Sequence, residues 1–233
     1  MPKIYVAVPC HNRKAIAEQC LPTIAPGLTH EDMLMLYNDG STEYGSDFLL
    51  GLGFRCAVCQ TGNIGIEAQR RRHFEHFANT ACTHLYLTDA DALHDPSWRF
   101  EALRLHEKYA GAPICLYNTP AHANMEGNTI DVGQEVIWRR VAPGISYFLS
   151  REQAMQVVQA LQTIHAVHWN WDWTVPQILN YRMAISKVSL VDHIGLGGYH
   201  HPPHEGLDGG DRALNPTPWL VEKRAEVVKA LSK

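Results

Sequence analysis

The stretch "LYLTDADALHDP", residues 85–96, joins a short apolar run to two aspartates that stand one residue apart. The apolar run is typical of the end of a buried strand, and such a strand stops where polar groups reach water. Asp89 and Asp91 are therefore expected to lie close together just outside the core. Two neighbouring carboxylates repel each other unless a positive group lies between them, and carboxylate oxygens suit Mg²⁺, Mn²⁺ or Ca²⁺. The stretch predicts a cation site at a strand end, with two solvated loop aspartates as the alternative.

The sequence around this stretch alternates β-rich runs with amphipathic helical runs. Such alternation is typical of parallel β-α-β units with right-handed crossovers. It predicts an α/β fold in which helices flank a Rossmann-like, mostly parallel sheet. The expected strands are 3–9, 32–41, 54–60, 83–91 and 112–118, and the expected helices are 13–24, 65–79 and 97–110.

The pattern changes after residue 118 and predicts a mixed second half. We expect extended strands around a Pro-Gly turn in 133–150, a helix in 151–165, a polar-aromatic loop and a helix in 167–182, and a strand in 183–195. Residues 200–218 are rich in Gly, Pro and His, which predicts a mobile loop, and a helix is expected in 218–232. The predicted organisation is one domain, 1–199, with halves 1–118 and 119–199, followed by the segment 200–233.

The bulk composition excludes several classes of protein. The chain has 233 residues, 45% hydrophobic and 19% charged, which suits one sizeable domain. A net charge of −4 gives no basic field for nucleic acid. No apolar run reaches the ~18 residues that span a bilayer. Without an export signal, we expect a cytoplasmic protein with six reduced cysteines. The pair Cys56 and Cys59 lacks the further ligands that zinc requires.

Polar clusters stand at the expected carboxyl ends of five strands. In open α/β sheets the ligand binds beyond these ends, so their convergence predicts a binding site at one edge of the sheet. The clusters are "PCHNR" (9–13), "YNDGS" (37–41), "QTGNIG" (60–65), "TDAD" (88–91) and "YNTP" (117–120).

Seven segments, in this order and spacing, resemble the motifs of the family 2 inverting glycosyltransferases of the GT-A fold. The resemblance covers roughly residues 3–197. The segments are "VAVPCHNR" (6–13), "YNDGSTE" (37–43), "NIGIEAQR" (63–70), "TDAD" (88–91), "APGISYFLSRE" (142–152), "WNWDW" (169–173) and "LVDHIG" (190–195).

The resemblance implies transfer of a sugar from a nucleotide sugar, expected to be a UDP-sugar, to a hydroxyl of a glycan, glycolipid or protein acceptor. Residues 1–118 would bind the nucleotide sugar, and residues 119–199 would bind the acceptor and carry the catalytic base. The transferred group would be a hexosyl or N-acetylhexosaminyl unit, with Mn²⁺ or Mg²⁺ as cofactor. Asp91 is the expected direct metal ligand, and Asp89 would hold the ribose or reach the metal through water. His193 matches the family's metal-site histidine and would favour Mn²⁺; alternatively it is structural.

The same resemblance implies the nucleotide site. The aspartate that Asp39 matches accepts a hydrogen bond from the uracil ring, whose imide N–H cytosine lacks; a turn aspartate before Gly40 is the alternative. The other expected nucleotide-sugar contacts are Pro9, His11, Asn12, Asn63, Arg70 and Ala90. The sequence departs from the family pattern in having Cys10 and His11 for threonine and tyrosine, Asn38 for the first aspartate of the second motif, and Gln69 before Arg70. Arg71 or Arg72 could therefore serve instead of Arg70, or all three could form a solvated helix face.

Asp172, between Trp171 and Trp173, is the candidate catalytic base. Aromatic packing removes water and raises a carboxyl pKa, which suits a general base; a helix cap is the alternative. Gly144 and Trp171 are the expected acceptor-side residues. The histidines of "YHHPPH" (199–204) are expected in a mobile acceptor-side lid, where nickel or zinc could bind adventitiously.

Two competing functions remain open from the sequence. A sugar-1-phosphate nucleotidyltransferase also uses an α/β sheet, but it needs a glycine-rich loop after the first strand, and "PCHNRK" (9–14) has no glycine. A degenerate nucleotide-sugar-binding domain would be expected to lose the base or a metal ligand. Asp91, Asp172 and His193 are all present.

Overall fold

The computed structural model describes residues 1–166, 168–195 and 212–232. Its centre is a nine-stranded sheet with the order β3-β2-β1-β4-β9-β6-β10-β8-β7. The first four strands in this order are parallel: β3 (Ala57–Thr61), β2 (Met33–Asp39), β1 (Ile4–Cys10) and β4 (His84–Thr88). Strand β1 is buried along almost its whole length, as expected for a central parallel strand covered on both faces.

The rest of the sheet is mixed. Strand β9 (Ser146–Ser150) runs antiparallel to β4 and to β6 (Ile114–Cys115). Strand β10 (Met183–Ser186) pairs in parallel with β6 and antiparallel with β8 (Val136–Arg139), which in turn pairs with β7 (Thr129–Val132). A separate two-stranded ribbon joins β5 (Ala92–His94) to β11 (Val191–His193). The ribbon brings residues that follow β4 next to residues from late in the chain.

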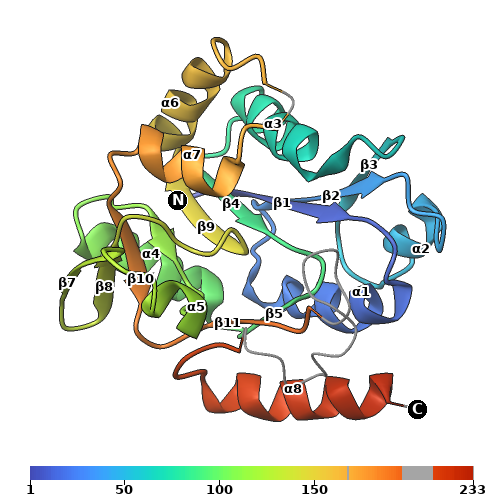
Figure 1. Cartoon of the computed structure of the whole chain (residues 1–233). Coiled ribbons are helices and arrows are strands. Elements are labelled where there is room, and N and C mark those ends of the chain that lie inside the picture. The colour runs from blue at the N-terminus through green and yellow to red at the C-terminus, as the bar shows by residue number, and fades with distance from the viewer. Residues whose placement is uncertain (167, 196–211, 233) are drawn as a thin grey trace.

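Helices cover both faces of the sheet (Figure 1). On one face lie α3 (Gly65–Ala78), α6 (Arg151–Leu161) and α7 (Trp171–Ile178). On the other lie α1 (Lys14–Cys20), α4 (Trp98–Lys108), α5 (Pro120–Ala123) and α8 (Pro218–Leu231). The remaining helical segments are α2 (Ser46–Leu50) and the 3₁₀ turns η1 (Leu21–Thr23) and η2 (Ala25–Gly27). No helix in the described part of the chain is long and apolar enough to cross a membrane.

Most expected elements are present, and the differences have local causes. The helix expected in 13–24 ends at Cys20 and continues as 3₁₀ turns, since Pro22 lacks the N–H that α-helical bonding needs. The strand expected in 112–118 is only two residues long, because the N–H of Leu116 bonds the Ser146 hydroxyl and that of Asn118 the Ser189 hydroxyl. Strand β7 is exposed along its length, so it has no core-facing pattern to detect.

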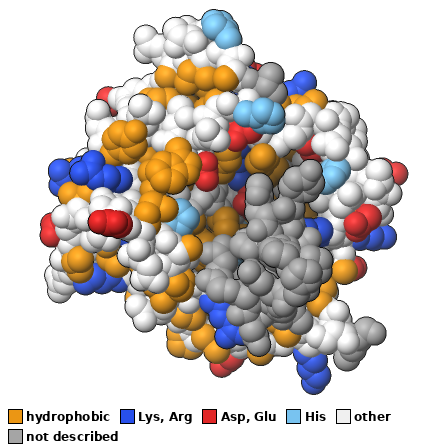
Figure 2. Space-filling model, viewed as in Figure 1, with side chains coloured by type: hydrophobic (Ala, Val, Ile, Leu, Met, Phe, Trp, Pro, Cys, Tyr) orange, Lys and Arg blue, Asp and Glu red, His pale blue; other side chains and the backbone are white. Residues whose placement is uncertain are grey.

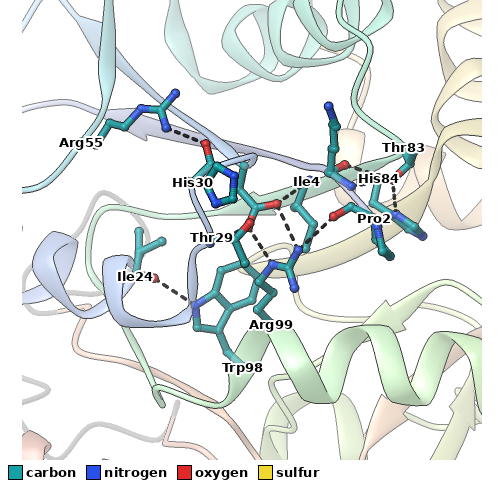
Figure 3. Close-up of polar contacts among 12 residues, drawn as sticks. Pro2, Ile4, Ile24, Thr29, His30, Arg55, Thr83, His84, Trp98 and Arg99 are labelled. Carbon is teal, nitrogen blue, oxygen red and sulfur yellow. Dashed lines mark hydrogen bonds and ion pairs between the residues drawn. The ribbon is translucent and has the colours of Figure 1, made fainter.

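A buried ion pair fastens the start of the sheet to α4. The Asp32 carboxylate accepts hydrogen bonds from the N–H of Ile4 at 2.8 Å and from Nε of Arg99 at 2.7 Å. Arg99 also donates to the carbonyl of Pro2, and the indole of the adjacent Trp98 donates to the carbonyl of Ile24 (Figure 3). These contacts fix β1 relative to α4 at the end of the sheet opposite the expected site.

Helix α8 packs back onto the first half of the chain. Leu220 and Val227 share a small apolar core with Ile16 of α1 and Leu93 of β5. The guanidinium of Arg224 also donates a hydrogen bond to Asp192 at 2.7 Å, and the hydroxyl of Thr217 donates one to Asp95 at 2.6 Å. The expected lid at 199–204 lies outside the described residues.

Candidate functional site

Two adjoining cavities lie at the carboxyl ends of the parallel strands. The first has a volume of about 300 Å³ and the second about 670 Å³. They meet at a common edge, which is formed by Arg13, Ile66, Asp89 and Asp91. Figure 2 shows acidic, basic and histidine side chains gathered near the middle of this face.

The residues expected from the sequence all line one or other cavity. Those in the first cavity are Pro9, His11, Asn12, Asp39, Asn63, Asp89, Ala90 and Asp91. Those in the second are Arg70, Gly144, Trp171, Asp172 and His193, again with Asp89 and Asp91. The fold therefore brings together groups that lie far apart in the sequence.

Asp91 faces two basic groups. Its Oδ2 lies 2.6 Å from Nη1 of Arg13 and 3.2 Å from Nε2 of His193. The ribbon sets this geometry, because the N–H of Ile194 donates to the carbonyl of Asp91 and His193 pairs with Ala92. Burial raises the pKa of Asp91, but the His193 imidazole and the Arg13 guanidinium outweigh burial and lower that pKa to about 2. Asp91 is therefore ionised at neutral pH.

Asp89 is bound to a different cation, Arg70. The Arg70 side chain is fully buried, and its guanidinium donates to the Asp89 carboxylate and to the carbonyl of Thr88. It also lies 4.4 Å from the ring centre of Trp171. Burial raises the pKa of Asp89, as does the Asp91 charge, while Arg70 acts in the opposite direction. Each carboxylate of the D-x-D segment thus has its own basic partner.

The structure distinguishes Arg70 from its neighbour Arg71. Arg70 reaches the D-x-D segment, whereas the Arg71 guanidinium donates to the carbonyls of Leu161 and Ile164 at 2.8 and 2.6 Å. Arg71 therefore ties α3 to the end of α6 and faces away from Asp89.

Asp91 at the common edge and His193 in the second cavity fit a divalent cation. Asp91 and His193 present an oxygen and a nitrogen 3.2 Å apart, and this donor set suits Mn²⁺. In the described parts of the chain, no group of three or more His, Cys, Asp or Glu side chains forms a complete metal site. Two protein ligands are consistent with a cation that also binds substrate phosphate oxygens. All six cysteines, including Cys56 and Cys59, are free thiols.

Asp39 holds the start of α3 in place. Its carboxylate accepts hydrogen bonds from the N–H groups of Ile64 and Gly65 at 2.7 and 2.9 Å, and from the amide of Gln69. Burial raises the pKa of Asp39, but these hydrogen bonds outweigh it and lower the pKa below the ordinary value. Oδ2 accepts only the Gly65 N–H among the described hydrogen bonds, so it keeps capacity for a ligand donor at the floor of the first cavity.

Left-handed backbone conformations occur at the rims of both cavities. Asn12 and Arg13 have φ values of 51° and 55°, and Asn170 has 48°. This conformation costs free energy in residues other than glycine, and residues that adopt it are concentrated at functional sites. The Asn12 amide oxygen accepts the N–H of Thr42 at 2.8 Å and so holds the turn. This turn directs Arg13 toward Asp91.

Asp172 lines the second cavity on the first turn of α7. The N-cap of α7 is Asn170, so the helix-cap alternative for Asp172 is wrong. Gly144 allows close packing here, since a Cβ at that position would lie 2.5 Å from the Trp171 ring. Trp169 and Trp171 are buried, whereas Trp173 is exposed.

Glu67 is a second carboxylate in this cavity, and the sequence reasoning missed it. Its Oε2 accepts the N–H of Trp171 at 3.3 Å, and its carbonyl accepts the indole N–H of Trp169 at 2.9 Å. Burial raises the pKa of Glu67, and the Asp172 charge adds to this. Glu67 lies three residues before Arg70 in α3, so the two side chains share one face of the helix. This spacing is the sequence signal that could have identified Glu67 as a site residue. Arg13 was also missed.

Comparison with solved structures finds proteins of the same fold. Residues 1–349 of S. aureus TarS give a TM-score of 0.58 at 12% identity, covering 78% of this chain and 57% of that chain. The mannosyltransferase PcManGT from Pyrobaculum calidifontis, in complex with GDP-Man and Mn²⁺, gives 0.57 at 15% identity, covering 85% and 59%. A TarS complex with UDP-GlcNAc gives 0.55 at 14% identity. The chain thus spans about three fifths of the length of these proteins.

No protein-family model matches the sequence, and a search of curated proteins gives no significant match. At these low identities the structural likeness establishes the fold. The expected fold class, a GT-A type α/β fold with a parallel first half and a mixed second half, is confirmed.

Proposed function

We propose that the protein is a glycosyltransferase that moves a hexosyl or N-acetylhexosaminyl group from a nucleotide sugar, a UDP-sugar, to an acceptor hydroxyl with inversion at the anomeric carbon. One observation supports this above all: two cavities meet at an edge that carries Asp89 and Asp91, and three basic side chains surround this edge. Such an edge suits a diphosphate that joins a nucleoside to a sugar.

In this proposal the nucleoside occupies the first cavity and the sugar enters the second. Asp39 accepts the imide N–H of uracil, and Asn63 and His11 border the base and ribose. Arg13 binds the diphosphate at the common edge, and Arg70 holds Asp89 in place from its buried position. The choice of UDP rests on Asp39, because TarS is described with UDP and UDP-GlcNAc but PcManGT with GDP-Man.

Asp91 and His193 would hold Mn²⁺ or Mg²⁺. When bound, the cation would neutralise charge that develops on the leaving diphosphate. PcManGT is described in complex with Mn²⁺, and the oxygen–nitrogen pair in this chain favours the same ion over Mg²⁺.

The proposed step is a single in-line displacement. The acceptor oxygen forms a bond to the anomeric carbon while the bond from that carbon to the diphosphate oxygen breaks. Asp172 takes the proton of the acceptor hydroxyl, and the electron pair of the broken bond leaves with the nucleoside diphosphate. Arg13 stabilises that charge at the common edge. One displacement inverts the configuration. The acceptor hydroxyl belongs to a glycan, a glycolipid or a protein.

A screen of UDP-, GDP- and CDP-sugars with Mn²⁺ tests this proposal. We expect release of UDP from at least one UDP-sugar, dependent on Mn²⁺ and abolished in Asp91→Asn. Formation of a nucleotide sugar and pyrophosphate from UTP and a sugar 1-phosphate would indicate a nucleotidyltransferase instead. Tight nucleotide-sugar binding without turnover toward any acceptor, water included, would indicate a binding domain.

A further inference from the structure

A third, smaller cavity opens beside the second one. Its volume is about 230 Å³, and Trp173 lines both this cavity and the second one. The other walls come from the loop between α5 and β7, the residues just after β8 and the segment after α7. Trp173 follows the candidate base Asp172 directly, so the small cavity adjoins the place where an acceptor hydroxyl would react.

Trp173 is half exposed although its neighbours are buried. Its exposed fraction is 52%, compared with 5% for Trp169 and 7% for Trp171. Tyr181, which also lines the cavity, is 36% exposed. Leaving a large aromatic ring in water forgoes the stabilisation that its burial would give, and tryptophans are frequent anchors at binding sites. The two rings thus offer flat apolar faces to a ligand.

The remaining wall of this cavity is preformed and carries its two charged residues, Glu126 and Arg140. Asn128 is buried and exchanges hydrogen bonds with the backbone of Val141, at 2.9 and 3.2 Å. Arg140 donates from Nε to the carbonyl of Gly127 at 3.1 Å. Glu126 and Arg140 therefore stand at the rim of a rigid pocket, and each can bond hydroxyl groups.

We propose that this cavity is an acceptor subsite, which binds one sugar ring of a glycan acceptor with its C–H face on Trp173. The inference rests on the proposed glycosyl transfer and selects the glycan among the possible acceptors. A pyranose has an apolar face and a rim of hydroxyls, and the cavity pairs aromatic faces with a carboxylate and a guanidinium.

Saturation-transfer NMR on the full chain tests the subsite with defined probes: methyl glycosides of common hexoses, α- and β-linked disaccharides, and n-octyl β-glucoside. We expect saturation of ring protons in at least one saccharide. Trp173→Ala should weaken that binding about tenfold, a typical loss for an aromatic anchor. Trp173→Phe should restore most of it, because the phenyl ring keeps the apolar face. The control Phe100→Ala removes a ring on α4 that is 65% exposed and lines none of the three cavities, so it should change nothing.

Three results would overturn the subsite: no saccharide signal in the wild type, an equal loss in Phe100→Ala, or saturation of the octyl chain alone. Calorimetry with UDP and Mn²⁺ separates this inference from the proposed function. Saccharide binding that depends on Trp173 in a protein that binds no nucleotide would leave the subsite standing and refute the transferase. Normal UDP-sugar turnover with saccharide binding unaffected by Trp173→Ala would support the transferase and refute the subsite.

Discussion

Nη1 of Arg13 lies 2.6 Å from Oδ2 of Asp91, the oxygen that His193 also faces. A guanidinium therefore occupies the side of the carboxylate where a metal ion would bind. A bound diphosphate would offer Arg13 another anionic partner and release Asp91 for the cation. Nucleotide and metal are then expected to bind cooperatively.

Replacing Arg13 tests this competition. In Arg13→Gln we expect Mn²⁺ alone to bind more tightly, since Asp91 loses its competing partner, while UDP binds about tenfold more weakly because a charged contact is lost. Calorimetry of Mn²⁺ with and without UDP measures both. Lys14→Gln is the matched control: the charge change is the same, one residue away, but Lys14 lies over Phe48 and lines neither cavity. Unchanged Mn²⁺ affinity in Arg13→Gln would refute the competition.

Asp91 should account for the effect of metal on nucleotide binding. In the wild type, Mn²⁺ should increase the affinity for UDP, and Asp91→Asn should remove most of that increase because a neutral amide is a poor ligand. Calorimetry of UDP at saturating Mn²⁺ and in chelator measures the difference. Asp131→Asn, an exposed aspartate on β7, serves as control. Equal UDP affinity with and without Mn²⁺ in the wild type would exclude a metal role.

Two carboxylates, Glu67 and Asp172, line the second cavity, and a pair of isosteric variants distinguishes their roles. Asp172→Asn should preserve UDP affinity and reduce transfer about 10²–10⁴-fold, the usual cost of losing a general base. Glu67→Gln keeps an oxygen to accept the Trp171 N–H, so we expect a loss of less than about tenfold. The reverse order of effects in initial-rate assays would assign the base to Glu67. A product with retained anomeric configuration would contradict the single-displacement mechanism altogether.

Nucleotide preference follows from the free lone pairs of Asp39. UDP should raise the melting temperature more than CDP or GDP at equal concentration, because stabilisation grows with occupancy of the native state. The uracil imide donates to a carboxylate, whereas the corresponding ring nitrogen of cytosine has no proton to donate. A thermal-shift series with Mn²⁺ gives the ranking. Equal or greater stabilisation by CDP would remove Asp39 from the proposed base contact, and greater stabilisation by GDP, whose guanine N1–H can also donate to a carboxylate, would contradict the preference for UDP.

The Asp32–Arg99 pair predicts an acid-dependent loss of stability. Burial raises the pKa of Asp32, but hydrogen bonds from Arg99, Thr29 and Ile4 outweigh it and lower the pKa below the ordinary value. The pair therefore stabilises the native state above about pH 4, the ordinary range of an aspartate, and this contribution disappears as pH falls through the lowered native pKa. Asp32→Asn should cost about 3 kcal/mol of unfolding free energy or more at pH 7.

Urea unfolding of Asp32→Asn and wild type at pH 7 and at pH 3 measures this contribution. The difference between the two proteins should shrink at the lower pH, since the wild-type carboxyl also becomes partly protonated. Asp131→Asn should differ little from wild type at either pH. A constant difference across this range would mean that Asp32 acts through shape and not through charge.

The strand-end residues of the site could be predicted from the sequence, because a single rule of parallel sheets applies to them. Asp39 ends β2 and Asp89 directly follows β4, and both strands pair in parallel with β1, so the topology places both residues at the same edge of the sheet. The contact of Arg13 with Asp91 depends on a left-handed turn that no hydrophobic pattern encodes. Glu67 meets Trp171 only because α3 packs near α7, residues more than a hundred positions apart. Tertiary contacts of this kind also determine that Arg70, and not Arg71, contacts Asp89. The spacing of the residues in the sequence cannot distinguish between these arginines.

Helix α8 has a consequence for how the protein folds during synthesis. Leu220 and Val227 cover α1 and β5, which leave the ribosome more than a hundred residues earlier. Until then, Ile16 and Leu93 lack part of their apolar cover, and Asp192 lacks its Arg224 partner. Contacts between residues so distant in sequence slow folding and leave aggregation-prone apolar surface exposed on the nascent chain. Helix α1, which follows the turn that carries Arg13, is therefore fully packed only late in translation. A stalled or truncated chain would contain all the strand-end motifs but would lack the helix that packs against α1 and β5.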